Sequence, residues 1–324
     1  MVTRIQNVAS FCRGVFYASV AAYIVLYSFE GSDDGGPTSA LRHRLLQHIS
    51  RNASFLTASL QGRLGNQMFV YASLYGIARR TGLEPVVAAD SELGHVFRHL
   101  AAMSMPRTLL EGFDVVVRDD ACCIYRSQLL RLPAGHVKIA SYLQAHRYFA
   151  DYASEIRDQF RFDEATTARA TAALLSALHS IGETPGSGNP RVGVHIRRGD
   201  YVKVSKVTGQ KMPPVSYIRK AMYHFRHRFP SAAFVIVTDD HVWALENVGG
   251  SDVAVISSPE PEVDMCVLAL CDHVIITTGT FGWWAAWLAG GDVVYYADVA
   301  TEGSLYARQF SSDDYFPPSW IGMT

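Results

Sequence analysis

Two adjacent arginines and an aspartate, Arg197, Arg198 and Asp200, follow directly on an apolar run in the segment VGVHIRRGDY (192–201). Because β-branched residues alternate in that run, it is predicted to be a strand, which places the arginines at its carboxyl end. A guanidinium presents a planar fork of N–H donors that matches phosphate oxygens, and a diphosphate leaving group gains negative charge as its bond to carbon breaks. The pattern therefore predicts an anion site. The alternative is that one arginine only pairs with Asp200 to close a loop.

A second candidate site lies in the segment GRLGNQMF (62–69). Its two glycines, the second of which is Gly65, allow tight backbone geometry before a helix, and Arg63 adds a cation. Asn66 stands in the first turn of that helix, where unpaired backbone amides attract anions. The spacing matches neither the P-loop nor the GxGxxG pattern of dinucleotide sites. The alternative is an ordinary helix start capped by Asn66.

A third candidate site combines Asp264 with the segment TTGTFGWWAAW (277–287). Thr278, Thr280 and Phe281 are predicted to join a strand to a helix N-terminus, where hydroxyls and free amides can hold a phosphate. The alternative is a hydroxyl cap on a core helix. The two tryptophans that follow would then pack in the core, and a core position is also what we predict for them.

Asp239 and Asp240 end another apolar run, FVIVTDD (234–240). Two carboxylates near a diphosphate would suit a divalent cation. Adjacent aspartates point in different directions, however, and the arginine pair already supplies positive charge. We therefore predict a loop or structural role for both residues, and no metal.

The composition places these cations in a nearly neutral chain. The chain has 324 residues, of which 49% are hydrophobic, and 29 Lys and Arg balance 30 Asp and Glu. Such a chain has ample apolar material for a core. A nucleic-acid-binding protein would normally carry a basic excess. We therefore expect no nucleic-acid partner, and we expect the cationic site to be local.

Short apolar runs alternate with helical periodicity after residue 55, which predicts a doubly wound α/β protein with parallel sheets. In the first half we predict strands at 55–60 and 85–89 and helices at 68–82, 149–160 and 163–180. In the second half we predict strands at 191–196, 232–238, 253–257, 273–277 and 292–296, a polar loop after the first of them, and helices at 215–229, 243–248, 263–271 and 279–290. The linker GETPGSGNP (182–190) is predicted to separate an N-terminal half, 56–185, from a C-terminal half, 186–324. Ligands are expected at the carboxyl ends of the strands.

The N-terminal region differs from the rest of the chain. Residues 14–29 carry no charge, the preceding tail 1–13 is basic, and acidic residues follow. This pattern predicts an uncleaved signal-anchor helix with a cytosolic tail, followed by a lumenal stem at 30–55. A cleaved signal peptide is the main alternative and a buried core helix the second. Asn52 lies in the sequon Asn-Ala-Ser and is predicted to be glycosylated.

The five cysteines fit either redox compartment. A disulfide between the pair Cys122 and Cys123 and the pair Cys266 and Cys271 is one option, and free buried thiols are the other. The spacing matches no zinc motif, so no bridge is assigned.

The chain resembles the α1,2-fucosyltransferases of the blood-group H type in four successive motifs: GRLGNQMF (62–69), HIRRGDY (195–201), FVIVTDD (234–240) and DMCVLALCDHVIITTGTFGWWAAWLAGGD (264–292). The ending YFPPSWIG is also similar, so the resemblance covers about residues 58 to 322. It implies transfer of L-fucose from GDP-fucose to the 2-hydroxyl of a terminal galactose on glycoprotein or glycolipid glycans, with inversion, no metal and no cofactor. It further implies a GT-B-like fold of two Rossmann-like halves and a single-pass type II protein of the Golgi membrane with a lumenal catalytic part.

The same resemblance assigns roles on the nucleotide side. Arg197 and Arg198 would contact the pyrophosphate and stabilise the departing GDP. His195 would lie at the guanine and ribose. Asp264 would accept hydrogen bonds from guanine N1–H and its 2-amino group, which distinguishes guanine from adenine.

On the phosphate side, the resemblance implies that Thr278, Thr280 and Phe281 line the site. Gly65 and Asn66 would approach the diphosphate from the other half of the molecule. The acceptor is expected to bind to the N-terminal half.

The catalytic base does not carry over from the resemblance. Related α1,6-fucosyltransferases have a glutamate about ten residues beyond their motif histidine, where this chain has Ser205. Asp200 is the nearest carboxylate and is taken as the candidate. The alternative functions are a fucosyltransferase of another linkage and a non-catalytic descendant that binds glycans or GDP-sugars. The second would be expected to lose the motif arginines or Asp264, and all are present.

Overall fold

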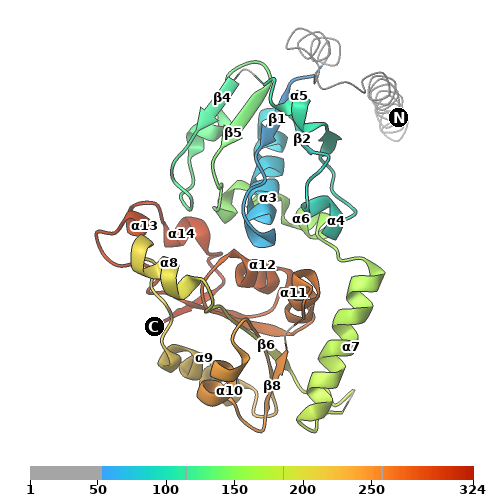
Figure 1. Cartoon of the computed structure of the whole chain (residues 1–324), viewed down its shortest axis with the longest axis vertical. Helices are drawn as coiled ribbons and strands as arrows, with labels where there is room; N and C mark the ends of the chain where they lie inside the picture. Colours follow the sequence, from blue (N-terminus) through green and yellow to red (C-terminus); the bar gives the residue numbers. More distant parts are fainter. Residues whose placement is uncertain (1–52, 114, 185, 257) are drawn as a thin grey trace.

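The computed structural model describes residues 53–324, apart from residues 114, 185 and 257 (Figure 1). The predicted tail, anchor and sequon, at 1–13, 14–29 and Asn52, lie outside the described residues. Within the described part of the chain, no helix is both long and apolar enough to cross a membrane.

Two separate parallel sheets organise the described chain. The order of the first is β3-β2-β1-β5-β4, and the order of the second is β11-β10-β9-β6-β7-β8. The strands are β1 (Phe55–Ala58), β2 (Glu84–Ala88), β3 (Met103–Met105), β4 (Val115–Arg118), β5 (Val137–Ala140), β6 (Arg191–Ile196), β7 (Ala233–Thr238), β8 (Val253–Ile256), β9 (His273–Ile276), β10 (Val293–Tyr296) and β11 (Ile321–Met323). The prediction of two α/β halves with parallel sheets is confirmed.

Helices connect successive strands, as parallel pairing requires. They are α3 (Leu64–Thr81), α4 (Leu93–Val96), α5 (Arg107–Leu110), α6 (Ala153–Gln159), α7 (Glu164–Ser180), α8 (Tyr201–Thr208), α9 (Val215–Arg228), α10 (His241–Val248), α11 (Pro261–Ala269), α12 (Thr280–Ala289), α13 (Leu305–Arg308) and α14 (Ser312–Tyr315). Short 3₁₀ turns occur at Ser127–Leu130, His146–Tyr148 and Ala150–Tyr152.

The region after β6 corrects one prediction. We predicted a polar loop between the arginine pair and α9, and the structure has the helix α8 at Tyr201–Thr208 there. Four of the eight residues in the sequence YVKVSKVT are β-branched, which disfavours an isolated helix. The helix ends in the left-handed residue Gly209, whose φ is 81°.

The helix α3 forms the centre of the first half because most of its length is apolar or small. Its residues from Met68 to Ala78 are all buried. Gly82 ends the helix in the left-handed conformation with φ 72°, as predicted from the sequence. Gly76 allows the helix to approach the chain at Tyr148, because a Cβ there would lie 2.1 Å from the Tyr148 carbonyl oxygen.

One apolar core joins the two halves. Trp283 and Trp284 of α12 are fully buried, and both contact Phe69 of α3, with ring centroids 4.5 Å and 5.1 Å away. The Trp283 indole N–H donates to the Tyr315 carbonyl oxygen at 3.0 Å. The prediction that the tryptophans belong to the core is confirmed. The two sheets are therefore joined by packing and do not form independent units.

The long helix α7 precedes the predicted linker 182–190 in the chain and lies beside the second sheet (Figure 1). It contacts α11 and β8, and its Arg169 pairs with Glu260 at 3.1 Å. Asp163 caps its N-terminus by accepting a hydrogen bond from the Thr166 N–H at 2.7 Å. The chain has therefore crossed from the first sheet to the second before this linker begins.

The cysteines do not form a bridge between the two pairs. Cys122 and Cys123 are bonded to each other, and Cys266 and Cys271 are free and buried. The backbone of Cys123 pairs with the chain beside Phe310, which ties the first half to the C-terminal segment.

Candidate active site

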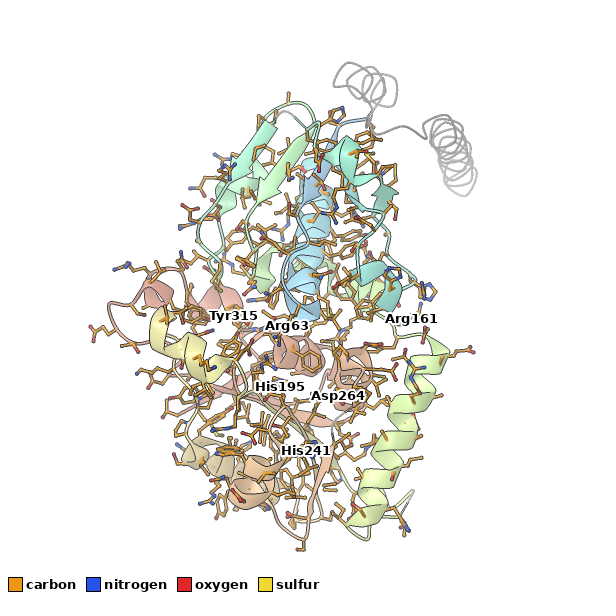
Figure 2. All side chains as sticks on the ribbon, in the orientation of Figure 1. Arg63, Arg161, His195, His241, Asp264 and Tyr315 are labelled. Carbon is orange, nitrogen blue, oxygen red and sulfur yellow. A yellow bond between two sulfur atoms is a disulfide. The ribbon has the colours of Figure 1, made fainter. Side chains whose placement is uncertain are left out.

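The order of the second sheet predicts where a ligand can bind. The chain runs outward from β6 to β7 and β8, and then returns to place β9 on the other side of β6. Ligands of open α/β sheets bind outside the carboxyl ends of the strands at such a reversal. Arg197 and Arg198 follow β6, and Thr277 and Thr278 follow β9, so both predicted segments lie at this point. Figure 2 labels Arg63, His195 and Asp264 in the region where the two halves meet.

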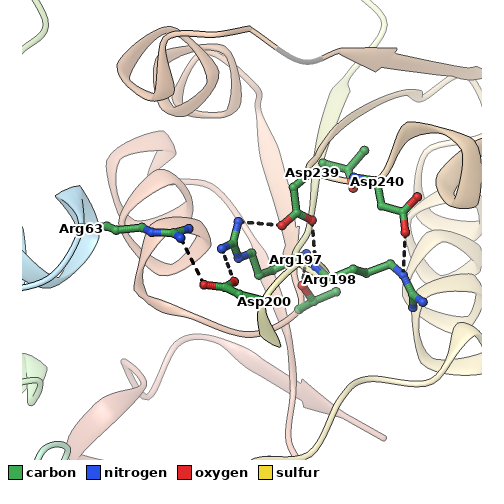
Figure 3. Close-up of polar contacts among 8 residues, drawn as sticks. Arg63, Arg197, Arg198, Asp200, Asp239 and Asp240 are labelled. Carbon is green, nitrogen blue, oxygen red and sulfur yellow. Dashed lines mark hydrogen bonds and ion pairs between the residues drawn. The ribbon is translucent and has the colours of Figure 1, made fainter. Parts of the chain in front are cut away.

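The side chain of Arg197 is held between two carboxylates. Its Nη1 pairs with Asp239 Oδ2 at 2.6 Å, and its Nη2 donates to Asp200 Oδ1 (Figure 3). Its backbone N–H donates to the Thr277 hydroxyl at 3.0 Å. That hydroxyl in turn donates to the His195 carbonyl oxygen at 3.1 Å, which fixes the end of β6 against the end of β9. The guanidinium is therefore positioned before any ligand binds.

Asp200 connects the two halves. Its second oxygen, Oδ2, accepts a hydrogen bond from Arg63 Nη2 at 3.1 Å, and Arg63 directly precedes α3 (Figure 3). The Asp200 side chain is 50% exposed. An exposed ion pair of this kind contributes little stability, about 0.2–1 kcal/mol. Through Asp200, the cation Arg63 of the first half lies close to the cation Arg197 of the second half.

Arg198 points toward α10. Its Nε donates to Asp240 Oδ2 at 3.2 Å, and its guanidinium lies 4.0 Å from the centroid of the Trp243 ring. Its backbone N–H donates to Asp239 Oδ1 at 2.9 Å. Asp240 also caps α10 by accepting from the Trp243 N–H at 3.2 Å. The carboxylates of Asp239 and Asp240 thus contact the arginine pair.

The N-termini of α3 and α12 meet at the same site. Thr280 donates its hydroxyl hydrogen to Asn66 Oδ1 at 2.7 Å. Gly65 leaves room for this approach, because a Cβ there would lie 2.7 Å from the backbone nitrogen of Phe281. Gly279, with φ 93°, turns the chain into α12. The N-termini of two helices therefore lie side by side, and the positive ends of their dipoles favour an anion.

His195 and Thr278 are buried polar groups beneath this surface. His195 is 5% exposed, its ring centroid lies 5.3 Å from that of Phe281, and a Cβ at Gly282 would lie 2.4 Å from its Nδ1. Burial lowers the pKa of His195 to about 3, so the imidazole is neutral. Neither His195 Nδ1 nor the Thr278 hydroxyl has a hydrogen-bond partner within residues 53–324 as described. Both are polar atoms for which a bound molecule or water is the remaining partner.

Asp264 lies in the first turn of α11. One carboxylate oxygen accepts from the Ser258 N–H at 2.8 Å. Burial raises the pKa of Asp264 to about 6, and the Ser258 bond and nearby His241 only partly offset this effect. A carboxylate that is partly withdrawn from water is well suited to accept hydrogen bonds from a ligand.

The structure also identifies contacts that the predicted set of site residues omits. Arg63, Asp239 and Thr277 all bind members of that set. Asp239 and Thr277 follow β7 and β9, the two neighbours of β6, so their proximity follows from the strand order. The sequence does not reveal strand order, although it marks each of these residues as the end of a strand.

Known proteins provide an independent comparison with this site. Residues 31–324 match the model of glycosyl transferase family 11. The chain is 32% identical over 295 residues to galactoside 2-alpha-L-fucosyltransferase Sec1 of Mus musculus, an alignment that covers 86% of this chain and 76% of the relative. It is 31% identical over 297 residues to galactoside alpha-(1,2)-fucosyltransferase 2 of Hylobates lar, with 89% and 84% covered. A crystal structure of POFUT1 in complex with GDP aligns with a TM-score of 0.49 at 9% identity, over 76% of this chain and 99% of that chain.

Proposed function

The chain belongs to glycosyl transferase family 11, and we propose that it transfers L-fucose from GDP-fucose to the 2-hydroxyl of a terminal galactose. Its two relatives named above are a galactoside 2-alpha-L-fucosyltransferase and a galactoside alpha-(1,2)-fucosyltransferase. The family resemblance of the four sequence motifs agrees with this proposal. The proposed acceptors are glycans of glycoproteins or glycolipids that end in galactose.

The observation that carries the proposal is the position of Arg197. Its guanidinium lies at the reversal of the second sheet, beside the N-termini of α3 and α12, and carboxylates on two sides hold its direction. Positive charge that is fixed in place before reaction stabilises a leaving group better than charge that must reorganise. The diphosphate of GDP-fucose is the group whose charge grows during transfer, and Arg197 and Arg198 are its proposed ligands.

The proposed reaction has one displacement at the anomeric carbon of fucose. The 2-hydroxyl oxygen of galactose forms a bond to this carbon while the bond to the β-phosphate oxygen breaks, and attack from the opposite face inverts the configuration. The electron pair of the broken bond stays with GDP, where Arg197 and Arg198 and the N-termini of α3 and α12, at Gly65, Asn66 and Thr280, offset the new charge. The hydroxyl proton is released to a base or to water.

Asp200 is the proposed base. Its two oxygens contact Arg63 and Arg197, and each keeps a second lone pair that can accept a proton. A transition state in which the bond to GDP is largely broken before attack needs little activation of the acceptor hydroxyl. Asp200 is therefore proposed to assist the proton transfer, and the main catalytic effect is assigned to the arginines.

On the nucleotide side, Asp264 is proposed to accept hydrogen bonds from guanine N1–H and the 2-amino group. The Ser258 N–H takes one acceptor position of Oδ1, so both oxygens retain lone pairs for the base. Adenine has no matching donors and would leave this carboxylate unpaired, which is the basis of selectivity. His195 is proposed to contact the guanine and ribose, with Phe281, Thr278 and Thr280 along the phosphates.

The cellular setting is also a proposal. Residues 14–29 are proposed to anchor the chain in the Golgi membrane with a cytosolic tail and a lumenal stem at 30–55. Within a GT-B-like arrangement, 56–185 would serve the acceptor and 186–324 the donor. Glycosylation at Asn52 tests the orientation, because only a lumenal Asn52 acquires a glycan that a glycosidase can remove.

The direct test is a transfer assay. The full chain is incubated with GDP-fucose and a panel of β-galactosides, fucose-free N-glycans and peptides, and NMR locates any new glycosidic bond. We expect α1,2-linked fucose on galactose, with activity that survives EDTA. A bond at another position would indicate a fucosyltransferase of another linkage. GDP binding without transfer to any acceptor would indicate a non-catalytic binding protein, and activity that returns only with Mn²⁺ would contradict the metal-free mechanism.

A further inference from the structure

A cavity lies at the carboxyl edge of the first sheet and has a volume of about 340 Å³. It is lined by the end of β1 from Thr57 onward, by the chain after β2 from Ala88 to Glu92, and by Lys138 of β5. The strand order β3-β2-β1-β5-β4 reverses between β1 and β5, so this is the ligand-binding position of an open α/β sheet. In the register of the sheet Thr57 pairs with Lys138 on one side. The cavity is therefore the topological equivalent, in the first half, of the arginine site in the second.

The cavity contains polar groups that lack partners. Thr57 is 1% exposed, and neither its hydroxyl nor that of Ser91 has a hydrogen-bond partner in the part of the chain that the structure describes. A buried hydroxyl without a partner costs folding free energy, so such groups in native proteins call for a bound molecule or water. Lys138 likewise has no ion pair with any described residue. These donors and acceptors are available to a ligand.

The charges around the cavity favour a neutral, hydroxyl-rich ligand. Arg107 is neutralised by Asp90 through two hydrogen bonds of 3.0 Å and 3.1 Å. The lining combines Lys138 with the acids Glu92 and Glu111, so it offers both donors and acceptors. A carboxylate that accepts and an ammonium that donates can together bind the hydroxyls of a sugar ring.

The cavity also adjoins the donor site. Gln67 lines it and donates to the Gly62 carbonyl oxygen at 2.9 Å and to Glu92 Oε2 at 3.2 Å. Gly62 precedes Arg63, which contacts Asp200, and Gln67 follows Asn66, which contacts Thr280. One turn of chain therefore separates the cavity from the proposed diphosphate site.

We propose that this cavity binds the terminal galactose of the acceptor glycan, with Glu92 accepting hydrogen bonds from sugar hydroxyls and Lys138 and Thr57 completing the contact. The proposal rests on the proposed function, since it identifies the acceptor site of that reaction. Gln67 holds Glu92 in place, and the galactose hydroxyls on the Gly62 side face the donor.

Two variants test the proposal in the full chain. Glu92→Gln keeps the shape of the side chain and removes its charge, and it should raise the KM for N-acetyllactosamine about tenfold or more, because hydrogen bonds to charged groups are the stronger ones. Thr57→Val removes a hydroxyl that has no partner in the protein, so it should raise the same KM about fivefold without lowering the melting temperature. The KM for GDP-fucose should stay within about twofold in both variants.

The matched control is Glu246→Gln, a carboxylate on α10 of the second half, which should leave both KM values unchanged. Saturation-transfer NMR of phenyl β-galactoside with the full chain and GDP provides a second measurement, independent of turnover. The galactoside signal should be present in the unmodified chain and lost in Glu92→Gln. An unchanged acceptor KM or an unchanged signal in Glu92→Gln would overturn the cavity as the acceptor site. Absence of turnover in the unmodified chain, with galactoside binding that still depends on Glu92, would instead overturn the proposed function.

Discussion

The carboxyl edges of the two sheets carry different kinds of polar groups. At the edge of the second sheet, Arg197 and Arg198 contact Asp200, Asp239 and Asp240. At the edge of the first sheet, the hydroxyl of Thr57 is buried without a partner among the described residues. In the second sheet, ion pairs hold the charged side chains in place. In the first sheet, a hydrogen-bonding group has no partner among the described residues.

Under the proposed function, this difference corresponds to two tasks in one reaction. Stabilising a leaving group requires charge that does not move, and a network of ion pairs provides it. Recognising a neutral sugar requires hydrogen-bond donors and acceptors that the protein has not already used. The two edges are held together by the Thr280–Asn66 hydrogen bond and by the tryptophans of α12 beneath it.

The largest expected effect tests whether the two edges belong to one folding unit. Trp283→Ala should lower the free energy of unfolding by about 3–5 kcal/mol, because it removes a fully buried indole that packs on Phe69 of the other half. Urea unfolding followed by circular dichroism should show one transition at lower urea concentration. The control Leu175→Ala, on the exposed side of α7, should change stability by less than about 1 kcal/mol. Two separate transitions would mean that the halves are independent.

The next effect tests whether the catalytic rate depends on the positioned cation Arg197 or on positive charge anywhere in the second half. Arg197→Ala should lower kcat about 10³-fold, because it removes the positioned cation at the proposed leaving group. The assay is the initial rate at saturating substrates. Arg219→Ala is the matched control, since Arg219 also lies in the second half but donates to the Asn247 carbonyl oxygen. Comparable activity in Arg197→Ala and Arg219→Ala would remove Arg197 from the mechanism.

A smaller effect tests whether the carboxylates position the arginines. Asp239→Asn keeps an oxygen for the Arg198 N–H and loses the charge that holds Arg197, so kcat should fall about 10-fold to 100-fold. Asp240→Asn weakens the Arg198 pair and keeps an oxygen for the cap of α10, so it should cost less. The GDP affinity measured by calorimetry should change little in Asp239→Asn. A loss confined to stability, with kcat retained, would show that the network only closes the loop.

The smallest effect is a pH dependence of donor binding. Burial raises the folded-state pKa of Asp264 to about 6, above its value in the unfolded chain, so protonation of this group stabilises the fold and that contribution is lost as pH rises through 6. Binding of guanine requires the ionised form and should follow the opposite trend. Calorimetry with GDP-fucose should give an affinity that falls about tenfold per pH unit below 6.

Asp264→Asn is the control for this experiment. Asparagine does not titrate, so the variant should bind more weakly and lose the pH dependence near 6. If the unmodified chain and Asp264→Asn show the same pH dependence of GDP-fucose affinity, a group other than Asp264 is responsible for it.

Part of this architecture was predictable from local patterns. The strands β6 to β10 and the helices α9 to α12 follow apolar runs and periodic segments that the sequence displays clearly, and α3 ends at the expected Gly82. The strands β3, β4, β5 and β11 and the helices α4, α5, α8, α13 and α14 were not predicted. Each is a short segment, and its conformation is decided by its neighbours more than by its own propensity.

The site divides in the same way. The residue types suited to diphosphate binding stand in four short motifs, so the sequence alone predicted the family's kind of chemistry and the candidate residues proposed to carry it. Only the tertiary structure decided which of them meet, because Arg63 and Asp200 are 137 positions apart and Asn66 and Thr280 are 214 apart. The cavity beside Thr57 depends on strand order and on hydrogen bonds that are not made, and neither leaves a periodic pattern in the chain. Local sequence sets backbone preference and charge, whereas the pairing of distant groups follows from how the two sheets pack.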